Sequence, residues 1–202
     1  LAVMGWRGLD AMVRTQSALQ ARADEALALQ VGLTQWRADL DAAVLVAGLP
    51  SVQWDGQVLR MVRRVDAGAA LESEGVVVAA WTRRTGDDGS LWRRWQSLPM
   101  TQRQELQAAW QQAALWARNP GASERARETA VLPLDDWQVY FFRNDAWTHP
   151  QSNDAPGRGR TVAAGEGQPD GVRIVLALPA GQPVSGPLTL DWVSPRLSGA
   201  AS

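Results

Sequence analysis

Cysteine is absent from this chain of 202 residues, and so is lysine. Without cysteine there is no disulfide, no thiol nucleophile and no thiolate metal ligand, so the fold must be stabilised by its apolar core. Histidine occurs once, at His149, which excludes a histidine pair for zinc. The sequence also lacks the G-x-S-x-G motif of a serine hydrolase. We therefore expect no catalytic residue and no metal site.

Charge and hydropathy point to neither a nucleic acid nor a membrane as the main partner. The 20 basic and 21 acidic residues leave a formal net charge of -1, so no global field attracts polyanions. Residues 1–4 are apolar, but a bilayer span needs roughly 20 such residues. As given, the chain is expected to be soluble. Its 46% hydrophobic and 20% charged residues are typical of one globular domain.

Residues 1–49 contain no proline, and their apolar residues recur mostly three or four positions apart. That spacing predicts a long helix, which Gly48 and Pro50 would end. A helix of about 40 residues is about 60 Å long, so we expect it to project beyond a body of this size. The expected apolar stripe comprises Leu9, Met12, Leu19, Ala23, Ala26, Leu33, Trp36, Leu40 and Val44.

Residues 50–202 are predicted to form the antiparallel β part of the same domain. Turn signals predict one hairpin from residues 52–65 and a second from residues 75–97. Residues 132–143 are expected to form one central strand, and residues 172–178 and 188–193 the last two strands. The apolar face of residues 101–118 predicts a helix capped by Thr101. The fold class is therefore α+β, with a long N-terminal helix packed on one or two antiparallel β-sheets and a short inserted helix at a sheet edge.

Several short segments follow one another in an informative order along the chain. They are GWRGLDAM at 5–12, WRADLD at 36–41, WRRW at 92–95, WQVYFFRNDAW at 137–147, GVRIVLAL at 171–178 and GPLTLDW at 186–192. In this order they resemble the J-type minor pseudopilins of bacterial type II secretion, which belong to the pilin-like family. Each segment is short, so the resemblance depends on their order over nearly the whole chain.

The resemblance implies a structural subunit at the tip of a periplasmic pseudopilus, and not an enzyme. Its partners would be I-type and K-type minor pseudopilins and the major pseudopilin. It also implies a single-pass inner-membrane protein with a periplasmic domain. The prepilin cleavage and methylation signature, and most of the membrane anchor, would then precede Leu1. A minor pilin of a type IV pilus, with a role in DNA uptake, is an alternative of the same architecture.

An apolar helix stripe that projects beyond its own domain exposes surface that only a partner or a membrane buries. The alternative is that the helix folds back on its own domain. We expect partner contacts from Trp6, Leu9, Met12, Val13 and Leu19.

Acidic pairs at Asp87-Asp88 and Asp135-Asp136 offer oxygen ligands for calcium, but neither has the alternating acidic loop of an EF-hand. A turn and a strand entrance explain them more simply, so we expect no cofactor. The GRGRT segment at 157–161 lacks the G-K-[ST] ending of a phosphate loop. This basic loop would form a nucleic-acid patch only if it converged with Arg83, Arg84, Arg93 and Arg94.

Tryptophan is abundant, with 11 residues in the chain. Exposed coplanar tryptophans would favour a carbohydrate-binding β module, which is the alternative from a different functional class. Most tryptophans lie within apolar patterns, which favours core packing. Trp92 and Trp95 are three positions apart in an expected strand, so they should face opposite sides of the sheet.

Overall fold

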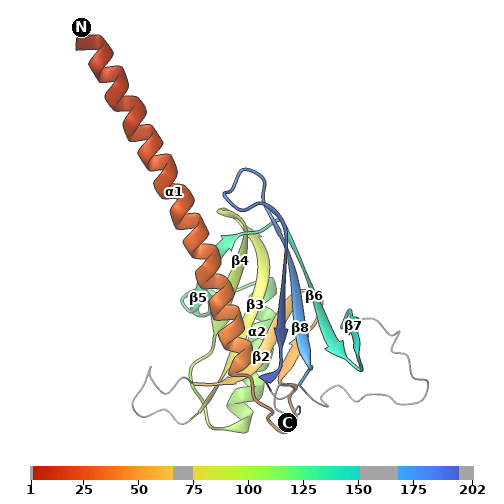
Figure 1. Ribbon diagram of the computed structural model, residues 1–202. Coiled ribbons are helices and arrows are strands. Elements are labelled where there is room, and N and C mark those ends of the chain that lie inside the picture. The colour runs from red at the N-terminus through yellow and green to blue at the C-terminus, as the bar shows by residue number, and fades with distance from the viewer. Residues whose placement is uncertain (1, 66–74, 151–167, 196–202) are drawn as a thin grey trace.

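The computed structural model describes residues 2–65, 75–150 and 168–195, and the side chains of these residues from Met12 onward. Figure 1 shows a long helix that rises from a body of two β-sheets. The helix, α1, spans Ala2–Asp41 and has 40 residues. It ends at Asp41 and not at Leu49, because the chain that follows runs beside β2 (Val58–Arg64), where Val44 N–H donates to Val62 O at 2.9 Å.

The first sheet has the strand order β1-β2-β3-β4-β5, and all its pairs are antiparallel. Both predicted hairpins are present. Asp55 closes the first, because its carboxylate accepts the N–H groups of Gln57 and Val58 at 3.0 and 2.9 Å. Gly89, with φ +92°, closes the second. The strands are β1 Val52–Trp54, β2, β3 Val76–Gly86, β4 Gly89–Gln96 and β5 Glu128–Pro133.

The second sheet has the order β7-β6-β8-β9 and is also antiparallel. Residues 132–143 do not form the single strand that was expected. The N–H of Leu134 donates to Ser90 O in the first sheet, and the next N–H, of Asp135, donates to Ala177 O in the second. The chain thus changes sheets at this point. The strands are β6 Asp136–Arg143, β7 Ala146–Thr148, β8 Gly171–Leu178 and β9 Gly186–Val193.

The buried side chains form two cores, one on each face of the first sheet. One core joins the end of α1 to both sheets, and the other lies between the first sheet and α2, which spans Arg103–Arg118. Trp92 belongs to the first core and Trp95 to the second, so they face opposite sides as predicted. Each core therefore holds a tryptophan from the same short strand.

The expected arrangement of the α+β fold needs correction. Helix α1 packs on the body only in its C-terminal turns, where Leu29, Leu33, Trp36 and Leu40 meet the core, and the strands form two sheets. The inserted helix is neither short nor at a sheet edge, because α2 has 16 residues and packs on the face of the first sheet. Its N-cap is Gln102 and not Thr101, and a second helix, α3 (Ala122–Arg125), follows it.

Asp39 fastens the end of α1 to the first sheet. Its side chain is fully buried and accepts the indole N–H of Trp81 at 2.9 Å. The guanidinium of Arg94 donates to both of its oxygens at 2.8 Å, and Arg63 lies 3.2 Å away. A buried carboxylate is tolerated only when it is paired and hydrogen-bonded, and these groups meet that requirement.

Asp41 makes the corresponding contact with the second sheet. The indole N–H of Trp192, in β9, donates to Asp41 Oδ1 at 2.7 Å. Residues two positions apart on a helix point about 200° away from each other. The last turn of α1 is therefore held from two sides, one carboxylate to each sheet, and this fixes the direction in which the rest of the helix projects.

Replacing Asp39 with alanine is expected to lower the free energy of unfolding by about 3–5 kcal/mol, because it removes the carboxylate that pairs with buried Arg63 and partly buried Arg94. Asp41→Asn is the matched control, since it keeps an oxygen acceptor for Trp192 and should cost about 1 kcal/mol or less. Urea unfolding at neutral pH measures both. A cost of less than about 1 kcal/mol for Asp39→Ala would contradict the role given to this carboxylate.

Candidate partner-binding site

The projecting part of α1 exposes large apolar side chains. Met12, Val13 and Leu19 are 70%, 60% and 61% exposed. The side chains of the other two contact candidates, Trp6 and Leu9, lie outside the described residues. In the described part of α1 the helix does not fold back, so the surface is available, while contact with a partner stays a prediction.

The apolar surface of α1 continues farther toward the body than the sequence indicated. Leu27 and Val31 are both 58% exposed, although the helix already touches the body at this level. Each lies two positions before a residue that packs on the core, Leu29 and Leu33, and so points to the opposite side of the helix. The four-residue spacing of Leu27 and Val31 in the sequence indicates that these two side chains share one face of the helix.

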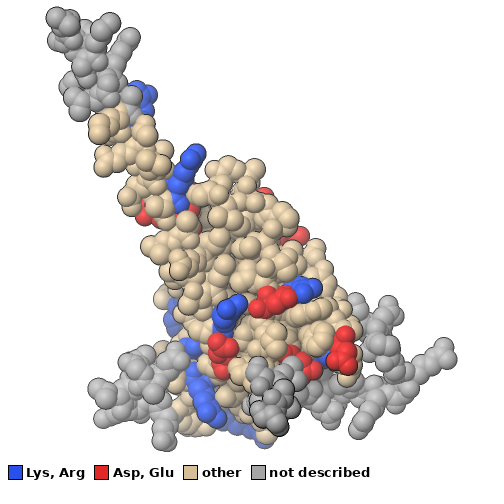
Figure 2. Space-filling view, viewed as in Figure 1, with Lys and Arg blue, Asp and Glu red and all other residues tan. Residues whose placement is uncertain are grey.

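The projecting helix carries charged side chains of both signs between its apolar residues, namely Arg14, Arg22, Asp24 and Glu25. Figure 2 shows uncharged surface between basic groups along its described part and acidic groups near its base, while acidic and basic groups lie side by side on the body. Apolar surface of this kind, at the end of a helix without packing of its own, is typical of a protein interface. Within the described residues, none of the helices has the length and apolar character required to cross a membrane.

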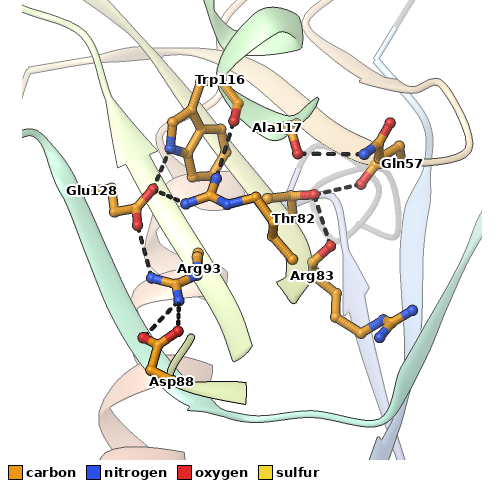
Figure 3. A network of polar contacts seen from close by, with 9 residues as sticks. Gln57, Thr82, Arg83, Asp88, Arg93, Trp116, Ala117 and Glu128 are labelled. Atoms are coloured by element: carbon orange, nitrogen blue, oxygen red, sulfur yellow. Dashed lines mark hydrogen bonds and ion pairs between the residues drawn. The ribbon is translucent and has the colours of Figure 1, made fainter. Parts of the chain in front are cut away.

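The body contains a second polar cluster, around Glu128 at the start of β5 (Figure 3). One Glu128 oxygen accepts Arg84 Nη2 at 2.5 Å and the indole N–H of Trp116 at 2.7 Å, and the other accepts Arg93 Nη1 at 2.8 Å. Arg93 also donates to both oxygens of Asp88, at 2.7 and 2.8 Å. These contacts join β3, β4 and β5 to the end of α2, so the cluster fastens α2 to the sheet.

The pKa of Glu128 is set more by its hydrogen bonds and neighbouring charges together than by its burial. Burial acts to raise the pKa, but hydrogen bonds from Arg84 and Trp116 and the charges of Arg84 and Arg93 outweigh it and hold the pKa below the ordinary value of 4.5. A lowered native pKa means that the charged form stabilises the fold above the unfolded-state pKa. This contribution is lost as the pH falls through the native pKa.

The four arginines considered for a nucleic-acid patch do not converge. Arg84 and Arg93 pair with Glu128 on the α2 side of the first sheet. Arg94 pairs with Asp39 on the α1 side, and Arg83 donates to Ser90 Oγ at 2.7 Å. The charges of these four side chains are divided between the two faces of the sheet and largely engaged, so the expectation that they converge is wrong.

The other candidate groups take structural positions where the structure describes them. The single histidine, His149, is half-buried with its ring 6.0 Å from that of Tyr140. Asp88 pairs with Arg93, while Asp135 and Asp136 are exposed where β6 begins. Within the described part of the chain, no three acidic or histidine side chains gather as a metal site would require. The glycine-rich segment 157–161 lies outside the described residues.

The tryptophans of the described side chains are mostly core residues. Nine of them are buried, and Trp147 is half-buried beside Phe142, with ring centroids 5.2 Å apart. The guanidinium of Arg173 covers the Trp147 ring at 4.2 Å. Among these side chains there is thus no pair of exposed, coplanar rings of the kind that a carbohydrate-binding platform requires.

Glu128→Gln is expected to lower the free energy of unfolding at pH 7 by about 3 kcal/mol, because two partly buried arginines lose their shared counter-ion. The free energy of unfolding of the variant should also fall less steeply below about pH 5 than that of the unchanged chain, because the depressed pKa of Glu128 no longer contributes. Asp88→Asn is the control, since the Asp88 side chain is 55% exposed and water screens its pairing with Arg93. Urea unfolding at several pH values checks this, and equal costs for the two variants would contradict it.

Comparison with known proteins finds a similar fold among the solved structures. No protein-family model matches the chain, and no curated protein matches it. The crystal structure of the GspK-GspI-GspJ complex from the type 2 secretion system of enterotoxigenic Escherichia coli contains a similar chain, with a TM-score of 0.52 and 13% sequence identity. The match covers 84% of this chain and 96% of that chain. The chain therefore has a pseudopilin-like α+β fold, while this likeness alone does not single out the J-type.

Proposed function

We propose that this chain is the periplasmic part of a minor pseudopilin of a type II secretion system, a structural subunit that binds other minor pseudopilins at the pseudopilus tip. The observation that carries the proposal is the exposed apolar surface of α1, formed by Met12, Val13, Leu19, Leu27 and Val31. An exposed apolar surface of this kind marks a site where a partner or a membrane binds. The related fold in a three-component secretion complex supports a protein partner.

The assignment to the J-type is the finer part of the proposal. It is supported by the order of the segments that resemble that family, from GWRGLDAM at 5–12 to GPLTLDW at 186–192. The I-type and K-type subunits and the major pseudopilin would then be the partners, at the periplasmic side of the inner membrane. A minor pilin of a type IV pilus would share the fold, and the identity of the bound partners distinguishes the two machines.

Met12→Asp and Leu19→Asp are each expected to weaken binding to soluble I-type and K-type pseudopilins of the same genome by about tenfold or more, because each places a charge in an apolar interface. Co-purification followed by light scattering detects the complex, and titration calorimetry measures the change. Leu115→Asp is the matched control, since Leu115 is 65% exposed on α2 and far from α1 in sequence.

Two results would contradict the proposal. One is the absence of any complex at high micromolar concentration of all three chains. The other is an equal loss of binding in Leu115→Asp, which would mean that any new surface charge disturbs the complex. Binding only to type IV pilus subunits would instead identify the chain as a minor pilin of that machine.

We also propose that the chain needs no cofactor. Its acidic pairs are engaged or isolated in the described residues, so calcium has little to bind there. The thermal unfolding midpoint is expected to stay the same in EDTA and in millimolar calcium. A rise of several degrees with calcium, removed by EDTA, would show a calcium site.

A further inference from the structure

A small apolar cavity lies at the base of the projecting helix. Its volume is about 60 Å³. A buried water needs roughly 10–15 Å³ by the same measure, so the cavity has room for a few atoms of a side chain and not for a whole element. Three parts of the chain form its apolar walls: α1, the end of β5, and the connection between β8 and β9. They contribute Ala26, Leu29, Leu132, Pro133, Pro183 and Val184.

One stripe of α1 leads from the exposed surface into this cavity. Met12, Leu19, Ala26 and Leu33 are each seven positions apart. Met12 and Leu19 are exposed, Ala26 lines the cavity, and Leu33 packs on the core. Because seven residues complete nearly two helical turns, the stripe drifts by only about 20° at each step. The exposed apolar residues of the projecting helix and the cavity therefore lie on one face of α1.

The size of a stable interface indicates that a partner extends from the helix onto the body. Stable complexes bury roughly 800 Å² on each partner, from 20 to 30 residues. The exposed apolar residues of the stripe on the projecting helix are too few to supply that area. The cavity is the apolar concavity that a partner on this stripe meets first, and Val184, which is 41% exposed, stands at it.

We propose that this cavity receives the end of an apolar side chain from a helix of a second pilin-like subunit, laid along the stripe of Met12 and Leu19. Residues seven positions apart lie on one face of a helix, so a partner helix laid along that face would contact Met12, Leu19 and Ala26 in turn. The small side chain of Ala26 leaves the space that the incoming residue fills. This inference rests on the proposed function, which supplies a partner with a helix of its own.

Ala26→Phe tests the proposal, because the new ring occupies the cavity from the side of α1. We expect it to weaken binding of the soluble I-type and K-type pseudopilins by about tenfold or more in calorimetry, without lowering the thermal unfolding midpoint of the free chain. Val184→Asp, which places a charge at the same cavity from the β8–β9 connection, should weaken binding similarly. Ala21→Phe is the control, since Ala21 is exposed and lies two positions from Leu19, on the opposite side of the helix.

The outcomes separate this inference from the proposed function. If Met12→Asp weakens the complex but Ala26→Phe and Val184→Asp bind as the unchanged chain does, the cavity is not part of the interface and the proposed function stands. If the unchanged chain forms no complex, both fail. A photo-cross-linker in place of Val184 gives an independent readout, and it should react with a helix of the partner. Cross-links confined to strands or loops of the partner would overturn the proposal.

Discussion

The structure depends on one buried carboxylate at the end of α1. Asp39 is held by Arg63, Arg94 and the indole N–H of Trp81, which all come from the first sheet. Hydrophobic packing alone would let the helix slide or rotate on the sheet, whereas a buried ion pair has directional contacts that are lost if either partner moves. With Asp41 bonded to the second sheet, this cluster fixes the line along which the helix leaves the body. The direction of the exposed apolar surface follows from that line.

Two of the segments that carried the family resemblance join the elements to one another. WRADLD at 36–41 contains both carboxylates at the helix end, and WRRW at 92–95 supplies a tryptophan to each core and an arginine to each polar cluster. The same four residues therefore serve α1 on one face and α2 on the other. This alternation is a direct result of strand geometry, in which successive side chains point to opposite faces.

Local signals in the sequence were sufficient for the hairpins, because a turn such as Asp55-Gly56 determines its own geometry. They were insufficient at Leu134 and Asp135, where apolar residues continue without a break although the chain passes from one sheet to the other. The place of α2 on the sheet face depends on distant contacts such as Trp95 with Trp116, which no local pattern reveals. For the candidate site, helix length and periodicity were enough to predict the exposure of Met12, Val13 and Leu19. Leu27 and Val31 were missed, because their exposure depends on which face of α1 the body covers.

The central claim is that the projecting half of α1 is bare in the free chain and covered in an assembly. Amide hydrogen exchange along α1, measured for the free chain and for its mixture with soluble I-type and K-type pseudopilins, tests this most directly. The account predicts fast exchange at residues 12–27 and slow exchange at residues 33–41 in the free chain, with the partners slowing exchange at residues 12–27. Slow exchange at residues 12–27 in the free chain, or no change there with either partner, would contradict it.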